Sequence, residues 1–150
     1  MANAKPSTLL VVDDDPSMTR LVVTVLERAL GDELSIEALT DPAVARERLD
    51  AGGIDIMLTD LEMPGVNGLD LLRCAKRRNA CTQVLFFTGH PSQDAHLSAL
   101  ELGAADYLLK PVDQQSLVEL ITQAHHRQQR WRQALAETWQ RRKEALATSS

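Results

Sequence analysis

The sequence predicts a doubly wound α/β domain, in which helices cover both faces of a five-stranded parallel sheet and an extended helix ends the chain. Short apolar runs alternate with stretches of 3.6-residue hydrophobic periodicity along the 150 residues. This alternation favours parallel strands, because right-handed crossovers place helices over the sheet. The composition, 44% hydrophobic and 25% charged, is that of an ordinary globular domain.

The strands are expected at five apolar runs, each too short to be a core helix. These runs are residues 9–12, 34–39, 54–58, 84–87 and 107–109, of which the second is the weakest. They give the sheet five strands.

The helices are expected between and after these runs. They comprise residues 16–30, 41–51, 68–78, 92–102 and a long segment from 114 to about 146. Asp15-Pro16 and Asp41-Pro42 each place a capping carboxylate before a proline at the first helical position. The last segment lacks Gly and Pro and is rich in Ala, Gln, Arg, Glu and Leu, which favours one continuous helix.

Charge divides the chain near residue 126. Residues 125–145 carry a net charge of +4 and the remainder carries −9, so we expect an acidic domain over 1–126 and a basic helical tail over 127–150. Apolar residues recur in the tail at alternating spacings of four and three, notably Trp131 and Leu135. This pattern predicts a homodimer formed through the C-terminal helix; the alternative is a solvated linker.

Several functional classes do not fit the composition. The first apolar run is broken by three aspartates and no apolar stretch approaches about 18 residues, so we expect no signal peptide, no membrane contact and a cytoplasmic location. Two cysteines are too few for a disulfide framework. Only charge suggests nucleic acid, and no helix-turn-helix pattern follows the domain, so we do not expect direct DNA binding.

Polar residues follow four of the five strands at the edge where a doubly wound sheet places its sites. They are Asp13 and Asp14 after the first, Asp60 after the third, Thr88 after the fourth and Lys110 after the fifth. Converging carboxylates repel by about 4 kcal/mol per pair at 4 Å. Oxygen ligands without His or Cys therefore predict a hard ion, Mg²⁺. A hydroxyl and a mobile cation beside that ion suit a phosphoryl group.

The same residues carry a family resemblance. The segments VVDDDPSMTRLV, IMLTDLEMPGVNGLDLL, VLFFTGH and GAADYLLKPV stand in the order and spacing of the receiver domain of two-component response regulators. The chain resembles a receiver from about Ser7 to about Ala124. The resemblance implies the strand order 2-1-3-4-5 and a cis peptide at Lys110-Pro111.

The resemblance also implies roles for these residues. Asp60 accepts a phosphoryl group from a histidine kinase or a histidine phosphotransfer protein, and the chain catalyses only its own phosphorylation and dephosphorylation. Asp13, Asp14, Asp60 and the backbone carbonyl of Glu62 hold Mg²⁺. The roles of the other side chains complete the site: Thr88 and Lys110 contact the phosphoryl oxygens, and Thr88 and Tyr107 switch conformation.

Two further positions border the expected path of attacking water. Glu62 lies two residues after Asp60 and His90 two after Thr88. These positions vary among receivers, and the resemblance implies that both residues tune the phosphoryl lifetime. The other histidines, His96, His125 and His126, have no ligand partners at suitable spacing and are expected at solvated helix positions.

An alternative is a phosphatase. LLVVDDDPS also resembles the first motif of haloacid-dehalogenase-type phosphatases, in which Asp13 would be the nucleophile and Asp15 the general acid. Thr88 and Lys110 would then bind phosphate. This reading leaves Asp60 and the MPG turn unexplained, and the chain lacks room for the inserted cap domain of that family.

Overall fold

The computed structural model describes residues 6–90 and 92–149, which form five strands and five helices in strict alternation. The elements are β1 (Ser7–Val12), α1 (Pro16–Leu30), β2 (Leu34–Leu39), α2 (Pro42–Asp50), β3 (Ile56–Thr59), α3 (Gly68–Arg78), β4 (Gln83–Thr88), α4 (Gln93–Glu101), β5 (Asp106–Leu109) and α5 (Gln114–Thr148). Every predicted element is present, with ends within two residues of those expected.

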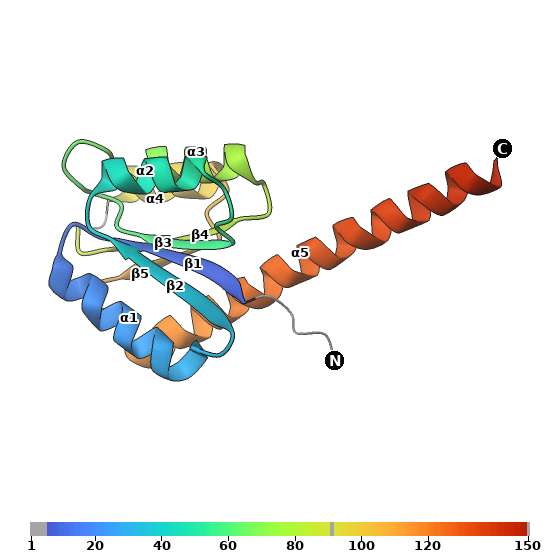
Figure 1. Ribbon diagram of the computed structural model, residues 1–150. Helices are drawn as coiled ribbons and strands as arrows, with labels where there is room; N and C mark the ends of the chain where they lie inside the picture. Colours follow the sequence, from blue (N-terminus) through green and yellow to red (C-terminus); the bar gives the residue numbers. More distant parts are fainter. Residues whose placement is uncertain (1–5, 91, 150) are drawn as a thin grey trace.

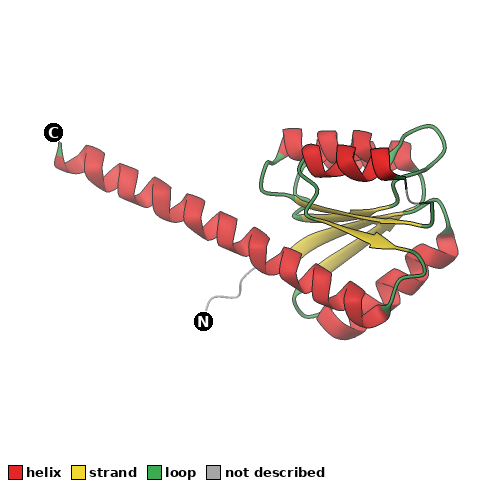
Figure 2. Ribbon diagram, turned by 180° about the vertical axis from the view of Figure 1, so that it is seen from behind, coloured by secondary structure: helices red, strands yellow, loops and turns green. Residues whose placement is uncertain are grey.

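The strands form one parallel sheet in the order β2-β1-β3-β4-β5, as predicted. Helices α2, α3 and α4 cover one face and α1 and α5 cover the other (Figure 1; Figure 2). Within the part of the chain that the structure describes, no helix combines the length and hydropathy that a bilayer crossing requires.

The core has two halves, because successive residues of a strand point to opposite faces. In β1, Leu9 and Val11 pack under α1 and α5, whereas Leu10 and Val12 pack under α2, α3 and α4; all four are fully buried. Burying one such side chain contributes about 1.5–3 kcal/mol. The sheet is thereby fixed from both sides, and its strand ends are held in place.

Side-chain caps begin the helices as the sequence predicts. Asp15 accepts a hydrogen bond from the Ser17 amide at 2.9 Å, and Asp41 accepts one from the Ala43 amide at 2.9 Å. Each removes one unpaired donor from the first helical turn.

Helix α5 runs for 35 residues without a break and leaves the domain as a straight rod (Figure 1). Its first part packs on the sheet through Leu117, Ile121 and Ala124. Gln128 is also fully buried, whereas every residue from 129 to 149 is exposed. The predicted extended helix is confirmed.

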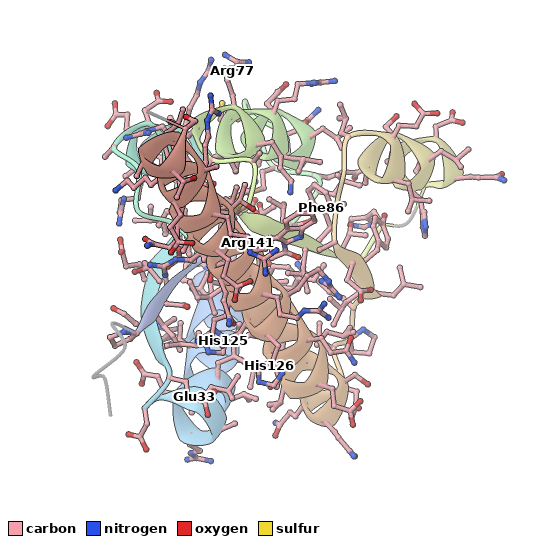
Figure 3. All side chains as sticks on the ribbon, turned by 90° about the vertical axis from the view of Figure 1, so that its right-hand side faces the viewer. Glu33, Arg77, Phe86, His125, His126 and Arg141 are labelled. Carbon is pink, nitrogen blue, oxygen red and sulfur yellow. The ribbon has the colours of Figure 1, made fainter. Side chains whose placement is uncertain are left out.

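The expectation for His125 was wrong: this side chain is buried, with 5% of its surface exposed. It lies on the side of α5 that faces the body of the domain, with Nε2 3.9 Å from Glu33 Oε2 (Figure 3). Burial, the largest cause, lowers the pKa of the imidazole. His126 is exposed, as expected.

Candidate functional site

The carboxylates at the ends of β1 and β3 meet at one edge of the sheet. Val12 pairs with Thr59 in the strand register, so Asp13 and Asp60 emerge side by side. Asp13 is fully buried, Asp60 is 7% exposed and Asp14 is exposed to solvent. Carboxylate oxygens of these three aspartates lie within 4.8 Å of one another. The predicted acidic cluster therefore exists.

Lys110 lies between two of these carboxylates. Its Nζ is 2.6 Å from Asp13 Oδ2 and 3.1 Å from Asp60 Oδ2, and it sits 4.7 Å from the centre of the Phe87 ring. Burial alone would lower the pKa of this ammonium, but the hydrogen bonds and charges of both aspartates outweigh it and raise the pKa. Lys110 is therefore held in its charged form.

The donor set fits a hard divalent cation. Three carboxylates face a single ammonium, which leaves the cluster with surplus negative charge. Desolvation, together with the neighbouring Asp13 and Asp60, raises the pKa of Asp14. The neighbours thus disfavour the charged form of Asp14, and a cation bound by oxygen ligands would relieve that repulsion.

Thr88 and Lys110 are placed together by the pairing of β4 with β5. The Lys110 amide donates to the Thr88 carbonyl at 2.8 Å, and the buried Thr88 Oγ1 accepts from the His90 amide at 3.2 Å. The Lys110-Pro111 peptide is cis, as the resemblance implied. The side chain of His90 is exposed.

The backbone of the loop after Asp60 contacts the Asp60 carboxylate. The Glu62 amide donates to Asp60 Oδ1 at 3.2 Å, while the Glu62 side chain is exposed. Gly68, at the start of α3, was missed by the sequence reasoning. A Cβ there would overlap the Asp60 carbonyl oxygen and lie 2.8 Å from the Phe86 ring, so only glycine allows α3 to approach so closely.

Tyr107 is half-buried on β5 and its hydroxyl is buried. Among the described residues, that hydroxyl has no hydrogen-bond partner. The ring lies 4.5 Å from the His96 ring and 6.4 Å from the Phe86 ring, centre to centre. Burial, then the charges of Glu62 and Asp60, raise the pKa of the phenol. His96 is exposed as expected, but its contact with Tyr107 gave no signal in the sequence.

Asp15 has a structural role. Its carboxylate caps α1 through the Ser17 amide, and its own amide donates to Asp13 Oδ1 at 2.9 Å. The general acid of the phosphatase alternative is thus engaged as a helix cap, outside the group formed by Asp13, Asp14 and Asp60.

Comparison with curated proteins finds relatives that are named as transcriptional regulators or response regulators. The DNA-binding transcriptional regulator NtrC of Escherichia coli K12 is 40% identical over 122 residues, covering 79% of this chain and 25% of NtrC. Response regulator protein PilR of Pseudomonas aeruginosa is 37% identical over 115 residues, covering 77% of this chain and 25% of PilR. The chain thus spans about a quarter of the length of these relatives.

Solved structures agree on the fold. The receiver domain of a Clostridium thermocellum response regulator is 29% identical, with a TM-score of 0.72, covering 82% of this chain and 97% of that one. The beryllofluoride-activated NtrC4 receiver domain dimer is 25% identical, with a TM-score of 0.73, covering 81% and 98%. The sequence model of the response regulator receiver domain matches residues 9–122. This chain therefore belongs to the response regulator receiver domain family.

Proposed function

We propose that this receiver accepts a phosphoryl group on Asp60, donated by a histidine kinase or a histidine phosphotransfer protein. One observation carries the choice of Asp60. It is the carboxylate that both contacts Lys110 and retains access to solvent, with 11% of its side chain exposed against 0% for Asp13. Asp14 is exposed, but its carboxylate receives no hydrogen bond from Lys110.

The proposed transfer depends on placement and charge. A carboxylate oxygen of Asp60 forms a bond to phosphorus as the bond from phosphorus to the donor nitrogen breaks. Lys110 and the Thr88 hydroxyl bind the phosphoryl oxygens, and the buried Asp13 keeps Lys110 charged and in position. Asp13, Asp14, Asp60 and the Glu62 carbonyl would hold Mg²⁺, which neutralises charge on the phosphoryl oxygens when bound.

The first test is the substitution Asp60→Asn, assayed with a small acyl phosphate in the presence of Mg²⁺. We expect labelling to be lost, because the amide is a far weaker nucleophile than the carboxylate. Asp70→Asn, which alters a carboxylate on α3, should label normally. A label on Asp13, or hydrolysis of a generic phosphoester by the wild type, would instead support the phosphatase alternative.

Glu62 and His90 are proposed to set the lifetime of the phosphoryl group. The exposed side chain of Glu62 lies in the loop after Asp60, and the exposed side chain of His90 lies just after the end of β4. At these places they can orient or repel attacking water. We expect Glu62→Ala combined with His90→Ala to change the dephosphorylation rate, measured by decay of the labelled protein. An unchanged rate would remove both residues from the site.

The output is proposed to be a changed surface around Thr88 and Tyr107. The Tyr107 hydroxyl is buried, and the Tyr107 ring contacts His96 on α4. A movement of this ring would therefore alter the surface of α4. We also propose that the protein acts in the cytoplasm, as expected from the sequence.

The tail over 127–150 is proposed to join two receivers. Its exposed tryptophans and leucines support self-association, since large apolar side chains on a free helix need a partner. The NtrC relatives are named as DNA-binding regulators. For the tail of this chain, only the positive charge would support DNA binding. We therefore propose that the tail contacts protein.

A further inference from the structure

The exposed part of α5 carries an apolar stripe, formed by Trp131, Leu135, Trp139 and Leu146 and interrupted by Arg142. These side chains are 49–64% exposed. Spacings of four, four and seven residues keep them on one side of a helix. Spacings of three and four residues continue this side backwards through Gln128, Ala124, Ile121 and Leu117, all of which are buried against the domain. The stripe therefore points to the side of α5 on which its own receiver lies.

Hydrogen bonds fix this orientation where the helix leaves the domain. Gln128 Nε2 donates to Asp55 Oδ1 at 2.9 Å, and Asp55 Oδ2 accepts from the Thr8 amide at 2.8 Å. Arg127 donates to Gln83 Oε1 at 3.0 Å. These bonds tie two adjacent residues of α5 to the starts of β1, β3 and β4, so the helix cannot turn about its axis without breaking them.

The fixed orientation restricts what can cover the stripe. The receiver lies at the base of the projecting helix (Figure 1). A partner helix laid on the stripe, parallel to α5 and in register with it, would therefore bring a second receiver into the space that the first one occupies. A flat surface such as a bilayer would meet the receiver before it reached the stripe. A partner helix that runs in the opposite direction avoids this clash, because the receiver of the partner then lies beyond the C-terminal tip of α5.

We propose that the stripe is covered by the same stripe of a second copy of this chain, with the two helices antiparallel. This inference rests on the proposed self-association. The available overlap is residues 129–148, about 30 Å of helix at 1.5 Å per residue. Trp139 then lies near the two-fold axis, and Trp131 packs near the partner's Leu146. The two receivers stand at opposite ends of the pair.

Salt separates this occupant from an acidic partner protein. Residues 129–148 carry five basic and two acidic side chains, so two paired tails repel each other. Screening weakens that repulsion, and the dimer should tighten between 50 mM and 500 mM salt. An acidic partner would bind more weakly over the same range.

Sedimentation of the full chain tests whether the stripe pairs at all. Leu135→Lys should convert the dimer to a monomer, whereas Gln133→Lys should not, since Gln133 lies on the opposite side of the helix and bonds Glu137. Both variants add one positive charge to the same helical turn. A wild type that sediments as a monomer would overturn both the self-association and its geometry.

Spin labels then test the direction. The labels are attached at Gln129→Cys and Ala136→Cys, which are seven residues apart and therefore lie on the same side of the helix. The two native cysteines are first replaced by Cys74→Ala and Cys81→Ser, so that only the introduced cysteine is labelled. In an antiparallel pair, the two labels at 129 are about 28 Å apart along the axis and those at 136 about 8 Å. Equal inter-label distances at both positions in a dimer would refute the antiparallel arrangement, while leaving the self-association and the proposed phosphorylation of Asp60 standing.

Discussion

At the scale of single residues, the site uses neighbouring side chains of one type for different purposes. Asp13 and Asp14 follow the same strand, yet Asp13 is fully buried against Lys110 and Asp14 is exposed. Successive residues at a strand end point in opposite directions, which separates them. The buried carboxylate holds the lysine, and the exposed one stays available to a cation.

Tyr107 offers a test of a buried polar atom. Tyr107→Phe removes a hydroxyl that has no hydrogen-bond partner among the described residues, and keeps the ring against His96 and Phe86. We expect the free energy of unfolding in urea to stay equal or rise by about 1 kcal/mol, because an unpaired buried group costs about that much. Tyr107→Ala, which also removes the ring, should lower it. A clear loss in the Phe variant would show that the hydroxyl is paired in solution.

At the scale of elements, the root of α5 is the part that sequence reasoning described least well. The strand-end residues of the site could be predicted, because parallel strands bring their carboxyl ends to one edge. His125 and Gln128 could not, since polar residues of a charged helix usually face solvent. Their burial follows from the direction in which α5 crosses the sheet, which is a tertiary property. Gly68 was missed for a similar reason: its contact with Asp60 depends on how closely α3 packs.

The buried His125 predicts a dependence of stability on pH. Burial holds the pKa of this imidazole below its unfolded value of about 6.5, so the unfolded chain binds the proton first as the pH falls. The stabilising contribution is complete above that value and is lost as the pH decreases from about 6.5 towards the folded pKa.

Urea unfolding between pH 8 and pH 5 measures this effect. Gln does not titrate, so in His125→Gln the free energy of unfolding should fall less between pH 6.5 and pH 5 than in the wild type. His126→Gln, at the exposed neighbouring position, should retain it. Identical curves for the wild type and His125→Gln would contradict the assignment.

At the scale of the whole molecule, we expect the acidic cluster to link the stability of the fold to Mg²⁺. The folded chain gathers three carboxylates within 4.8 Å, and the unfolded chain does not. A ligand at a hundredfold excess over its dissociation constant raises the free energy of unfolding by about 2.7 kcal/mol. We therefore expect Mg²⁺ to raise the melting temperature, followed by circular dichroism.

Asp14→Ala should remove most of that increase, since it deletes an exposed ligand without disturbing the buried pair of Asp13 and Lys110. Asp41→Ala, which removes a helix cap far from the cluster in sequence, should lower the melting temperature and still respond to Mg²⁺. Superimposable melts of the wild type with and without Mg²⁺ would contradict a metal site.

The attachment of α5 has a mechanical consequence. Asp55, which holds Gln128, and Asp60 lie at opposite ends of the same buried strand, about 16 Å apart at 3.3 Å per residue. The free part of the helix is a lever arm about 30 Å long, so a tilt of about 10° at its base would move its tip by about 5 Å. A displacement of that size, directed across the helix axis, is about half the diameter of a helix with its side chains. A small tilt of the helix at its base would therefore reach the far end of the rod as a sideways shift large enough to separate side chains that are in contact there.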